Sequence, residues 1–160
     1  PGSNMKLASG IARIEDMLEK GVKVAIGTDG PASNNCLDMF REMFLVTALA
    51  KIKGENAAAL SADKVLKMAT VEGAHCMGLH NADVLAEGKL ADLIMIDLHQ
   101  PNMQPINNIE KNIVYSGSKQ NVKMTMVDGK ILYEEGKFYI GVSPEEVYAK
   151  ANEIINRMKG

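Results

Sequence analysis

The stretch KVAIGTDGPASNN, residues 23–35, decides how the rest of the chain is interpreted. The run Val22–Thr28 is apolar and rich in β-branched residues, and it lacks polar alternation, which favours a buried strand. This run stops at a Thr-Asp-Gly turn, so Asp29 directly follows the end of the expected strand. Reactive groups of parallel α/β proteins lie at the carboxyl ends of strands. Asp29 is therefore a functional candidate, although an Asp before Gly also commonly bonds its own turn backbone.

Helices are expected on both sides of this strand. Ile11–Lys20 has apolar residues at helical spacing and is followed by Gly21, a typical residue after a helix end. Leu37–Lys53 forms a longer helical pattern, and a further helix is predicted over residues 61–79. A helix followed by a buried strand is the repeating half of an α/β unit, so residues 1–79 predict an α/β fold.

The pattern changes to strands and tight turns over residues 80–142. An Asp-Gly pair at residues 128–129 predicts a hairpin. The last segment, residues 143–160, predicts a helix, with Ser143 as N-cap, Pro144 in the first turn and Glu146 at the capping-box position. The strands predicted before it are Leu93–Leu98, Asn112–Ser116, Val122–Val127 and Lys130–Tyr133.

The composition is that of a globular domain. The 160 residues are 46% hydrophobic and 24% charged, and the net charge of -2 gives no basic face for nucleic acid and no polybasic membrane signal. No apolar run approaches the roughly 20 residues of a membrane span. Cys36 and Cys76 lie far apart without a Cys-x-x-Cys spacing, which favours reduced thiols in a cytoplasmic protein, while a disulfide between them stays open.

Other reactive residue types give weaker signals. Ser3 and Ser33 have no His neighbour in the sequence that would activate them. Cys36 follows a turn at a helix start, where thiols can become reactive, but a core or surface thiol is the simpler interpretation. A metal site needs about four ligands, of which Asp29 supplies one. The histidines form no His-x-His pair and are interpreted as structural or exposed: His75, His80 and His99.

Several motifs together resemble one family. GVKVAIGTDGPASNNCLDMFREM, residues 21–43, closely resembles the strand-eight region of the amidohydrolase superfamily, in particular its methylthioadenosine/S-adenosylhomocysteine deaminases. PGSNMKLASGI, residues 1–11, is similar to the strand-seven loop of that family. The resemblance continues through KMATVEGAHCMGL (67–79), LAEGKLADLIMIDL (85–98) and NIVYSGSKQNVKMTMVDGKILYEEGKF (112–138).

This resemblance implies a (β/α)8 TIM-like barrel with a small β-sandwich beside it. On that basis residues 1–79 are the last part of the barrel, residues 80–142 are the carboxy-terminal part of the sandwich, and residues 143–160 are a carboxy-terminal helix. The His-x-His pair, the further metal-binding His and the acid/base Glu of the family are expected upstream of Pro1. The chain is therefore expected to be a carboxy-terminal fragment that either needs the missing part of the barrel or self-associates.

The resemblance also implies a role for Asp29. The matching Asp binds a divalent metal, with zinc expected, and accepts a proton from the water that attacks the purine carbon bearing the amine. The small-molecule substrate would be methylthioadenosine or S-adenosylhomocysteine, and the fragment alone is expected to be inactive with the metal unbound or weakly bound. The alternatives are another amidohydrolase, of guanine, cytosine or chlorotriazine type, and a non-catalytic assembly module that a partner chain completes.

Overall fold

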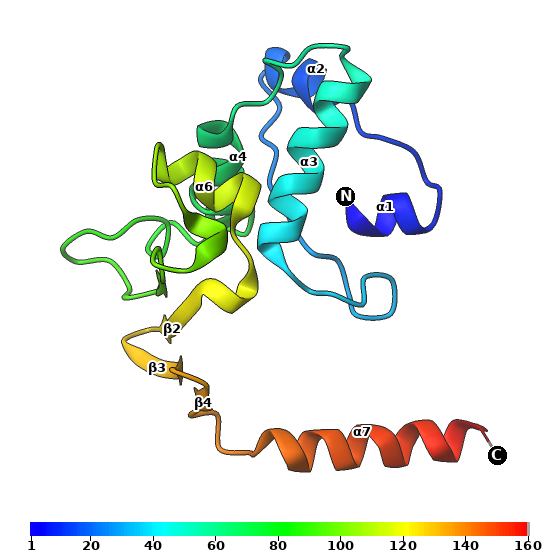
Figure 1. Ribbon diagram of the computed structural model, residues 1–160, viewed down its shortest axis with the longest axis vertical. Coiled ribbons are helices and arrows are strands. Elements are labelled where there is room, and N and C mark those ends of the chain that lie inside the picture. Colours follow the sequence, from blue (N-terminus) through cyan, green and yellow to red (C-terminus); the bar gives the residue numbers. More distant parts are fainter. Residues whose placement is uncertain (160) are drawn as a thin grey trace.

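The computed structural model describes residues 1–159, which form a helical body, a small sheet and a separate last helix (Figure 1). The helical body contains α1 (Gly2–Lys6), α2 (Ile14–Glu19), α3 (Met39–Lys53), α4 (Ala62–Ala69), α5 (Val71–Cys76) and α6 (Ile109–Ser116). The other elements are β1 (Leu93–Ile96), β2 (Val122–Val127), β3 (Lys130–Glu134), β4 (Lys137–Phe138), α7 (Pro144–Lys159) and the 3-10 turns η1 (Pro101–Met103) and η2 (Lys119–Asn121).

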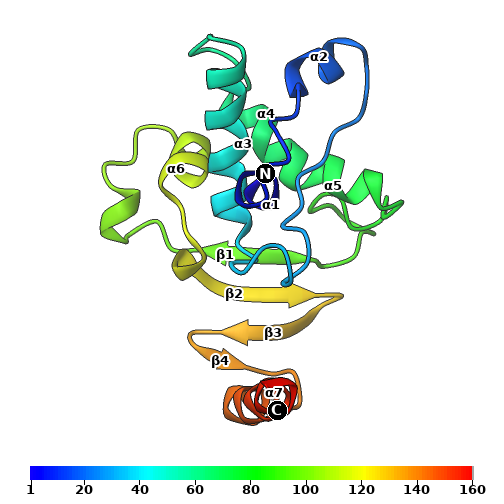
Figure 2. The same cartoon turned by 90° about the vertical axis from the view of Figure 1, so that its right-hand side faces the viewer.

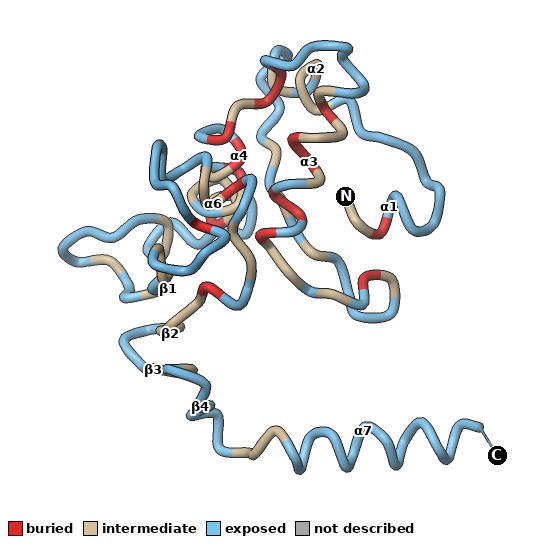
Figure 3. Tube along the Cα trace, viewed as in Figure 1, coloured by how far each residue is buried: buried red, intermediate tan, exposed pale blue. Residues whose placement is uncertain are grey.

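The hydrophobic core lies where α3, α4 and α6 meet. Burying these side chains removes apolar surface from water, which is the main favourable term in folding. Figure 3 shows buried residues concentrated along these helices, while α7 and the outer strands are exposed. The core cluster consists of Phe40, Met43, Val46, Ala50, Leu60, Ala62, Val65, Met68 and Val114.

The side chain of Asp38 caps the N-terminus of helix α3. Oδ1 of Asp38 accepts hydrogen bonds from the backbone N–H groups of Phe40 (3.0 Å) and Arg41 (3.3 Å), which satisfies two donors that the first turn leaves free. Leu37 has a φ of 44°, so its backbone cannot continue the helix. The helix predicted over Leu37–Lys53 is confirmed, but it starts two residues later for this reason.

The helix predicted over residues 61–79 is divided in two. Thr70 separates α4 from α5 with non-helical backbone angles, φ -123° and ψ -94°. Its hydroxyl donates to the carbonyl of Leu66 at 2.8 Å, the back-bonding that Thr makes at the end of a helix. The prediction of a single long helix was therefore wrong, because the backbone leaves the helical conformation at Thr70.

The strand predicted over Asn112–Ser116 is also wrong, because these residues lie in α6. Oδ1 of Asn108 accepts from the backbone N–H of Lys111 at 2.9 Å and so caps the start of the helix. Val114 is fully buried against α3 and α4. A short apolar run fits a strand or a buried helix equally well, and here tertiary packing selects the helix.

The sheet is antiparallel and has the order β1-β2-β3-β4 (Figure 2). The Asp-Gly hairpin is confirmed: Asp128 and Gly129 have φ values of 49° and 73°, as a type I′ turn requires, and Val127 pairs with Lys130. A second two-residue turn at Glu135 and its following glycine joins β3 to β4, which the sequence analysis did not predict. Strand β2 has the predicted bounds Val122–Val127.

The expected strand Val22–Thr28 is not formed within residues 1–159. Its chain is extended, and the N–H of Ile26 donates to the carbonyl of Met68 at 3.1 Å. A strand is defined by a ladder to a neighbouring strand, and residues 1–92 of this chain offer it none. The prediction of a parallel strand at this place is therefore corrected to an extended segment beside α4.

Helix α7 is capped as predicted. The N–H of Ser143 donates to Oε2 of Glu146 at 2.9 Å, and the N–H of Glu146 donates to the hydroxyl of Ser143 at 3.2 Å, which together form a capping box. The helix lies beyond β4, far from the helical body, and none of its residues is buried (Figures 1 and 3).

None of the helices within residues 1–159 combines the length and the apolar character that crossing a membrane requires.

Candidate active-site loop

Asp29 lies in a turn that we call the Asp29 loop, residues 28–36. Its backbone has a φ of 62°, a left-handed conformation that Asp tolerates better than most residues. Oδ1 accepts a hydrogen bond from the N–H of Gly30 at 2.8 Å, and Oδ2 accepts one from the hydroxyl of Ser33 at 2.6 Å. The carboxylate thus bonds its own turn, which was the simpler of the two interpretations of Thr-Asp-Gly.

These two hydrogen bonds leave acceptor positions of the Asp29 carboxylate free. A carboxylate offers about four acceptor positions, and the loop uses two of them while the residue stays exposed to solvent. The hydrogen bond from Ser33, and after it the one from the backbone of Gly30, lowers the pKa of Asp29 below its ordinary value. Asp29 is therefore held ionised and oriented, with lone pairs free for a cation or a proton.

The amino-terminal segment, residues 1–7, lies beside the Asp29 loop. The hydroxyl of Ser3 donates to the hydroxyl of Ser33 at 3.4 Å, and Nζ of Lys6 donates to Oδ1 of Asn35 at 2.5 Å. No catalytic role was expected for either serine, and the structure links both to Asp29 through the Ser33 hydroxyl. The two loops that resemble the family's strand-seven and strand-eight loops are thus adjacent in space.

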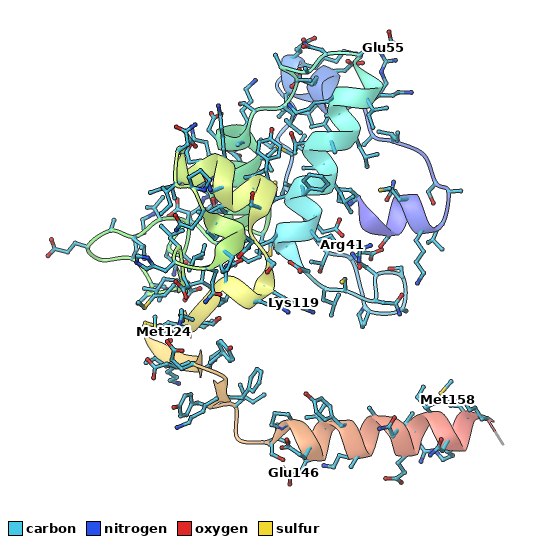
Figure 4. The ribbon with its side chains drawn as sticks, in the orientation of Figure 1. Arg41, Glu55, Lys119, Met124, Glu146 and Met158 are labelled. Atoms are coloured by element: carbon cyan, nitrogen blue, oxygen red, sulfur yellow. The ribbon has the colours of Figure 1, made fainter. Side chains whose placement is uncertain are left out.

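Glu42 is a further residue at this place that the sequence analysis did not single out. It lies on α3 with 1% of its surface exposed, and it contacts both the amino-terminal segment and the Asp29 loop. Figure 4 shows its neighbour Arg41 at the start of α3, where the helix meets the loop. An acidic residue within the apolar pattern of Leu37–Lys53 was the only sequence signal that pointed to it.

The histidines and cysteines considered from the sequence make no hydrogen bond to Asp29. Nε2 of His75 on α5 is 2.8 Å from Oδ2 of Asp83, so this His has a structural partner. His80 and His99 lie outside the regular helices and strands, as expected. Both cysteines are free thiols, so the disulfide that the sequence left open is not formed.

The donor set of this chain does not complete a metal site. Among residues 1–159 no group of three or more His, Cys, Asp or Glu side chains gathers in one place. Asp29 offers one anionic oxygen, while a zinc site uses about four ligands. Any metal at Asp29 would depend on ligands from outside these residues.

The chain is similar in sequence to curated nucleoside deaminases. The chain is 50% identical over 132 residues to a 5-methylthioadenosine/S-adenosylhomocysteine deaminase of Thermococcus sibiricus, covering 82% of this chain and 31% of that protein. It is 43% identical over 160 residues to a 5'-deoxyadenosine deaminase of Methanosarcina acetivorans, covering 98% of this chain and 37% of that protein. The chain thus spans about a third of the length of the curated relatives it matches.

A solved structure shares the fold over almost the whole chain. A zinc-bound adenosine deaminase from Xanthomonas campestris superimposes with a TM-score of 0.94 at 34% identity, covering 99% of this chain and 36% of that one. The model of the amidohydrolase family matches residues 1–132, which include the Asp29 loop, Glu42 and strands β1 and β2. The chain belongs to the amidohydrolase family.

Proposed function

We propose that this chain is the carboxy-terminal part of a metal-dependent amidohydrolase that deaminates an adenosine-type nucleoside. The observation that carries the proposal is the match to deaminases of methylthioadenosine, S-adenosylhomocysteine and 5'-deoxyadenosine at 43–50% identity. These named substrates share the adenosine group, and they differ in the substituent at the 5' position. The shared group therefore defines the substrate class, and methylthioadenosine or S-adenosylhomocysteine is the proposed substrate.

The missing part of the protein would complete two structural units. Residues 1–79 would close a (β/α)8 barrel, with Val22–Thr28 as its last strand between neighbours supplied by the rest of the polypeptide. Residues 80–142 would form the carboxy-terminal part of a β-sandwich, followed by the helix of residues 143–160. Two observations support this arrangement: Val22–Thr28 has no strand partner within residues 1–159, and it borders an apolar groove lined by Ile11, Val24 and Val46.

Asp29 would be both a metal ligand and the proton acceptor of the reaction. Its pKa, held below the ordinary value by Ser33, keeps it ionised at neutral pH, as both roles require. A divalent metal, with zinc proposed because the structural relative holds it, would be held by Asp29 together with ligands from the rest of the polypeptide, and when bound it would lower the pKa of a water molecule. Asp29 would accept one proton of the attacking water as the water oxygen bonds the purine carbon and the electron pair of the ring C=N bond moves to the ring nitrogen. It would then give this proton to the amine nitrogen as the carbon–nitrogen bond breaks and ammonia leaves, and the second water proton would end on the ring nitrogen.

The chain alone is proposed to be inactive, with metal unbound or weakly bound, because it supplies one ligand of about four. The two free thiols fit a reducing compartment, and we place the protein in the cytoplasm.

The test is an ammonia-release assay on the full-length protein that carries these residues. We expect zinc-dependent turnover of methylthioadenosine or S-adenosylhomocysteine and none by residues 1–160 alone. Ammonia release from guanine or cytosine instead, or chloride release from a chlorotriazine, would show that the proposed substrate class is wrong. No turnover of any of these by the metal-loaded full-length protein would favour a non-catalytic assembly module.

A further inference from the structure

Glu42 is a buried carboxylate whose two oxygens face two different segments. Oε2 accepts a hydrogen bond from the N–H of Gly2 at 2.8 Å, and Oε1 accepts one from Nδ2 of Asn34 at 2.7 Å. The first donor belongs to the amino-terminal segment and the second to the Asp29 loop. Burying a charge is costly unless it is paired, so these bonds must compensate its desolvation.

Asn34 has a fixed orientation that requires an acceptor at position 42. Its Nδ2 donates to the carbonyl of Thr28 at 2.7 Å as well as to Glu42, and its Oδ1 accepts from the N–H of Cys36 at 3.1 Å. Flipping the amide would break the bonds to both Thr28 and Cys36. A carboxylate offers an acceptor on each side, whereas a Gln would present its NH₂ group to one of the two donors.

Gly2 packs closely on Glu42, so a side chain at position 2 would meet the Glu42 carboxylate. A Cβ atom at position 2 would lie 2.5 Å from Oε1 of Glu42 and 3.1 Å from Nδ2 of Asn34. The three residues therefore fill their shared space, and a methyl group added at position 2 must displace the Glu42 carboxylate.

The charge state of Glu42 agrees with this pairing. Burial raises the pKa of Glu42, whereas the hydrogen bonds from Gly2 and from Asn34 lower it, because they stabilise the charged form. These two bonds come from a backbone N–H and a side-chain amide, which a longer polypeptide also contains.

Both contacts of Glu42 are connected to Asp29 through a few intervening residues. Through Asn34 it holds the carbonyl of Thr28, the residue directly before Asp29. It also holds Gly2, the residue directly before Ser3. The hydroxyl of Ser3 contacts that of Ser33, and Ser33 donates a hydrogen bond to Asp29.

We propose that Glu42 is a positioning residue: it fixes the Asp29 loop against the amino-terminal segment and thereby sets the direction of the Asp29 carboxylate. This inference rests on the proposed role of Asp29, and it adds a residue that touches neither the metal nor the substrate. A misplacement of about 1 Å in a reacting group can cost about 10²-fold in rate, so fixing this loop matters for turnover.

The test compares Glu42→Gln and Gly2→Ala with Thr47→Val in the full-length protein. Thr47 is a matched control, because it is a fully buried polar residue on the same helix whose hydroxyl donates to the carbonyl of Leu60 at 2.9 Å, away from the loop. Hydrogen exchange is measured at the N–H groups of Asn34 and Cys36, which bond within the loop. Steady-state kinetics then give kcat and KM separately.

We expect exchange at these two amides to become roughly tenfold faster in Glu42→Gln and Gly2→Ala, and to stay unchanged in Thr47→Val. We expect kcat to fall about 10- to 100-fold in both test variants, with KM changing little, because the misplaced group acts in the chemical step. Gly2→Ala removes no buried group, and urea unfolding of each variant shows whether a loss of turnover comes from the displaced carboxylate or from unfolding of the protein.

Unchanged exchange in folded Glu42→Gln and Gly2→Ala would overturn the proposal. So would wild-type kcat in variants whose loop exchanges faster. A wild-type protein without deaminase turnover would instead overturn the proposed function, and the exchange rates would still decide whether Glu42 holds the loop.

Discussion

The hydroxyl of Ser33 donates a 2.6 Å hydrogen bond to Oδ2 of Asp29 across one turn of the Asp29 loop. The same hydroxyl lies 3.4 Å from the hydroxyl of Ser3, so one small side chain connects the candidate catalytic carboxylate to the amino-terminal segment. A hydrogen bond to the charged form of a carboxyl group stabilises that form. Ser33 thus influences both the direction and the protonation of Asp29.

Ser33→Ala should raise the pKa of Asp29 toward its ordinary value, because Ser33 is the largest cause of the lowered pKa. A carboxyl group with a lowered folded-state pKa adds stability above its unfolded pKa and loses it as the pH falls through the folded value. The variant should therefore lose this small contribution at a higher pH than the wild type. NMR titration of the Asp29 carboxyl carbon measures the pKa directly. An identical titration in both proteins would show that the bond is absent in solution.

The side chain of Asp83 connects the segment after α5 to α5 by contacts with Lys89 and His75. Its Oδ1 accepts from Nζ of Lys89 at 2.6 Å, and His75 lies 2.8 Å from its Oδ2. Lys89, and after it His75, holds the pKa of Asp83 well below its usual range.

Asp83→Asn should therefore lower the free energy of unfolding at pH 7, and the difference from the wild type should shrink as the pH falls below about 4, where the unfolded carboxyl becomes protonated. Urea unfolding at pH 7 and at stepwise lower pH measures it. Asp16→Asn is the control, since its ion pair with Arg13 is exposed and such pairs contribute little. A difference that stays constant with pH would contradict the assignment.

The parts of the fold that the sequence predicts are those that depend on short local patterns. The hairpin at Asp128 and the capping box of α7 were predicted correctly, because turn and cap chemistry depends on a few consecutive residues. Helix α6 was missed because its short apolar run fits two structures, and only packing of Val114 against α3 decides between them. Val22–Thr28 was predicted as a strand from its composition, but strand pairing needs neighbours that a local pattern does not contain.

In the candidate site, too, a local sequence pattern identified one residue and missed another whose partners are distant in the sequence. Asp29 was identified from its place after an apolar run, and its catalytic and metal roles remain proposals. Glu42 could not be identified, because its partners Gly2 and Asn34 are 40 and 8 residues away in the sequence. Its acidic character alone does not distinguish it from an exposed helix residue.

Met68→Ala should destabilise the helical body by about 2–5 kcal/mol, because it removes a buried side chain and leaves a cavity in the core of α3, α4 and α6. Met158→Ala is the matched control on α7: its side chain is 77% exposed and lies near the far end of that helix (Figure 4), so the change should stay within about 0.5 kcal/mol. Urea unfolding measures both. Equal effects in the two variants would contradict the assignment of the core.

Residues 1–160 alone should self-associate. The backbone of Val22–Thr28 lacks a strand ladder, and α7 exposes Val147, Ile154 and Met158 along one face. Exposed apolar surface and unpaired extended backbone favour association with another chain. Light scattering over a concentration series should show oligomers together with binding of an apolar dye. A stable monomer at all concentrations with little dye binding would contradict this prediction.

The most direct test of the account is Asp29→Asn in the metal-loaded full-length protein, with Asp16→Asn as the control. Asn keeps the size of the side chain but cannot accept a proton as a carboxylate does. We predict that deamination of methylthioadenosine or S-adenosylhomocysteine falls about 10²–10⁴-fold in kcat, while Asp16→Asn keeps wild-type turnover. Wild-type deamination by a folded Asp29→Asn protein would contradict the central claim that this carboxylate carries the chemistry.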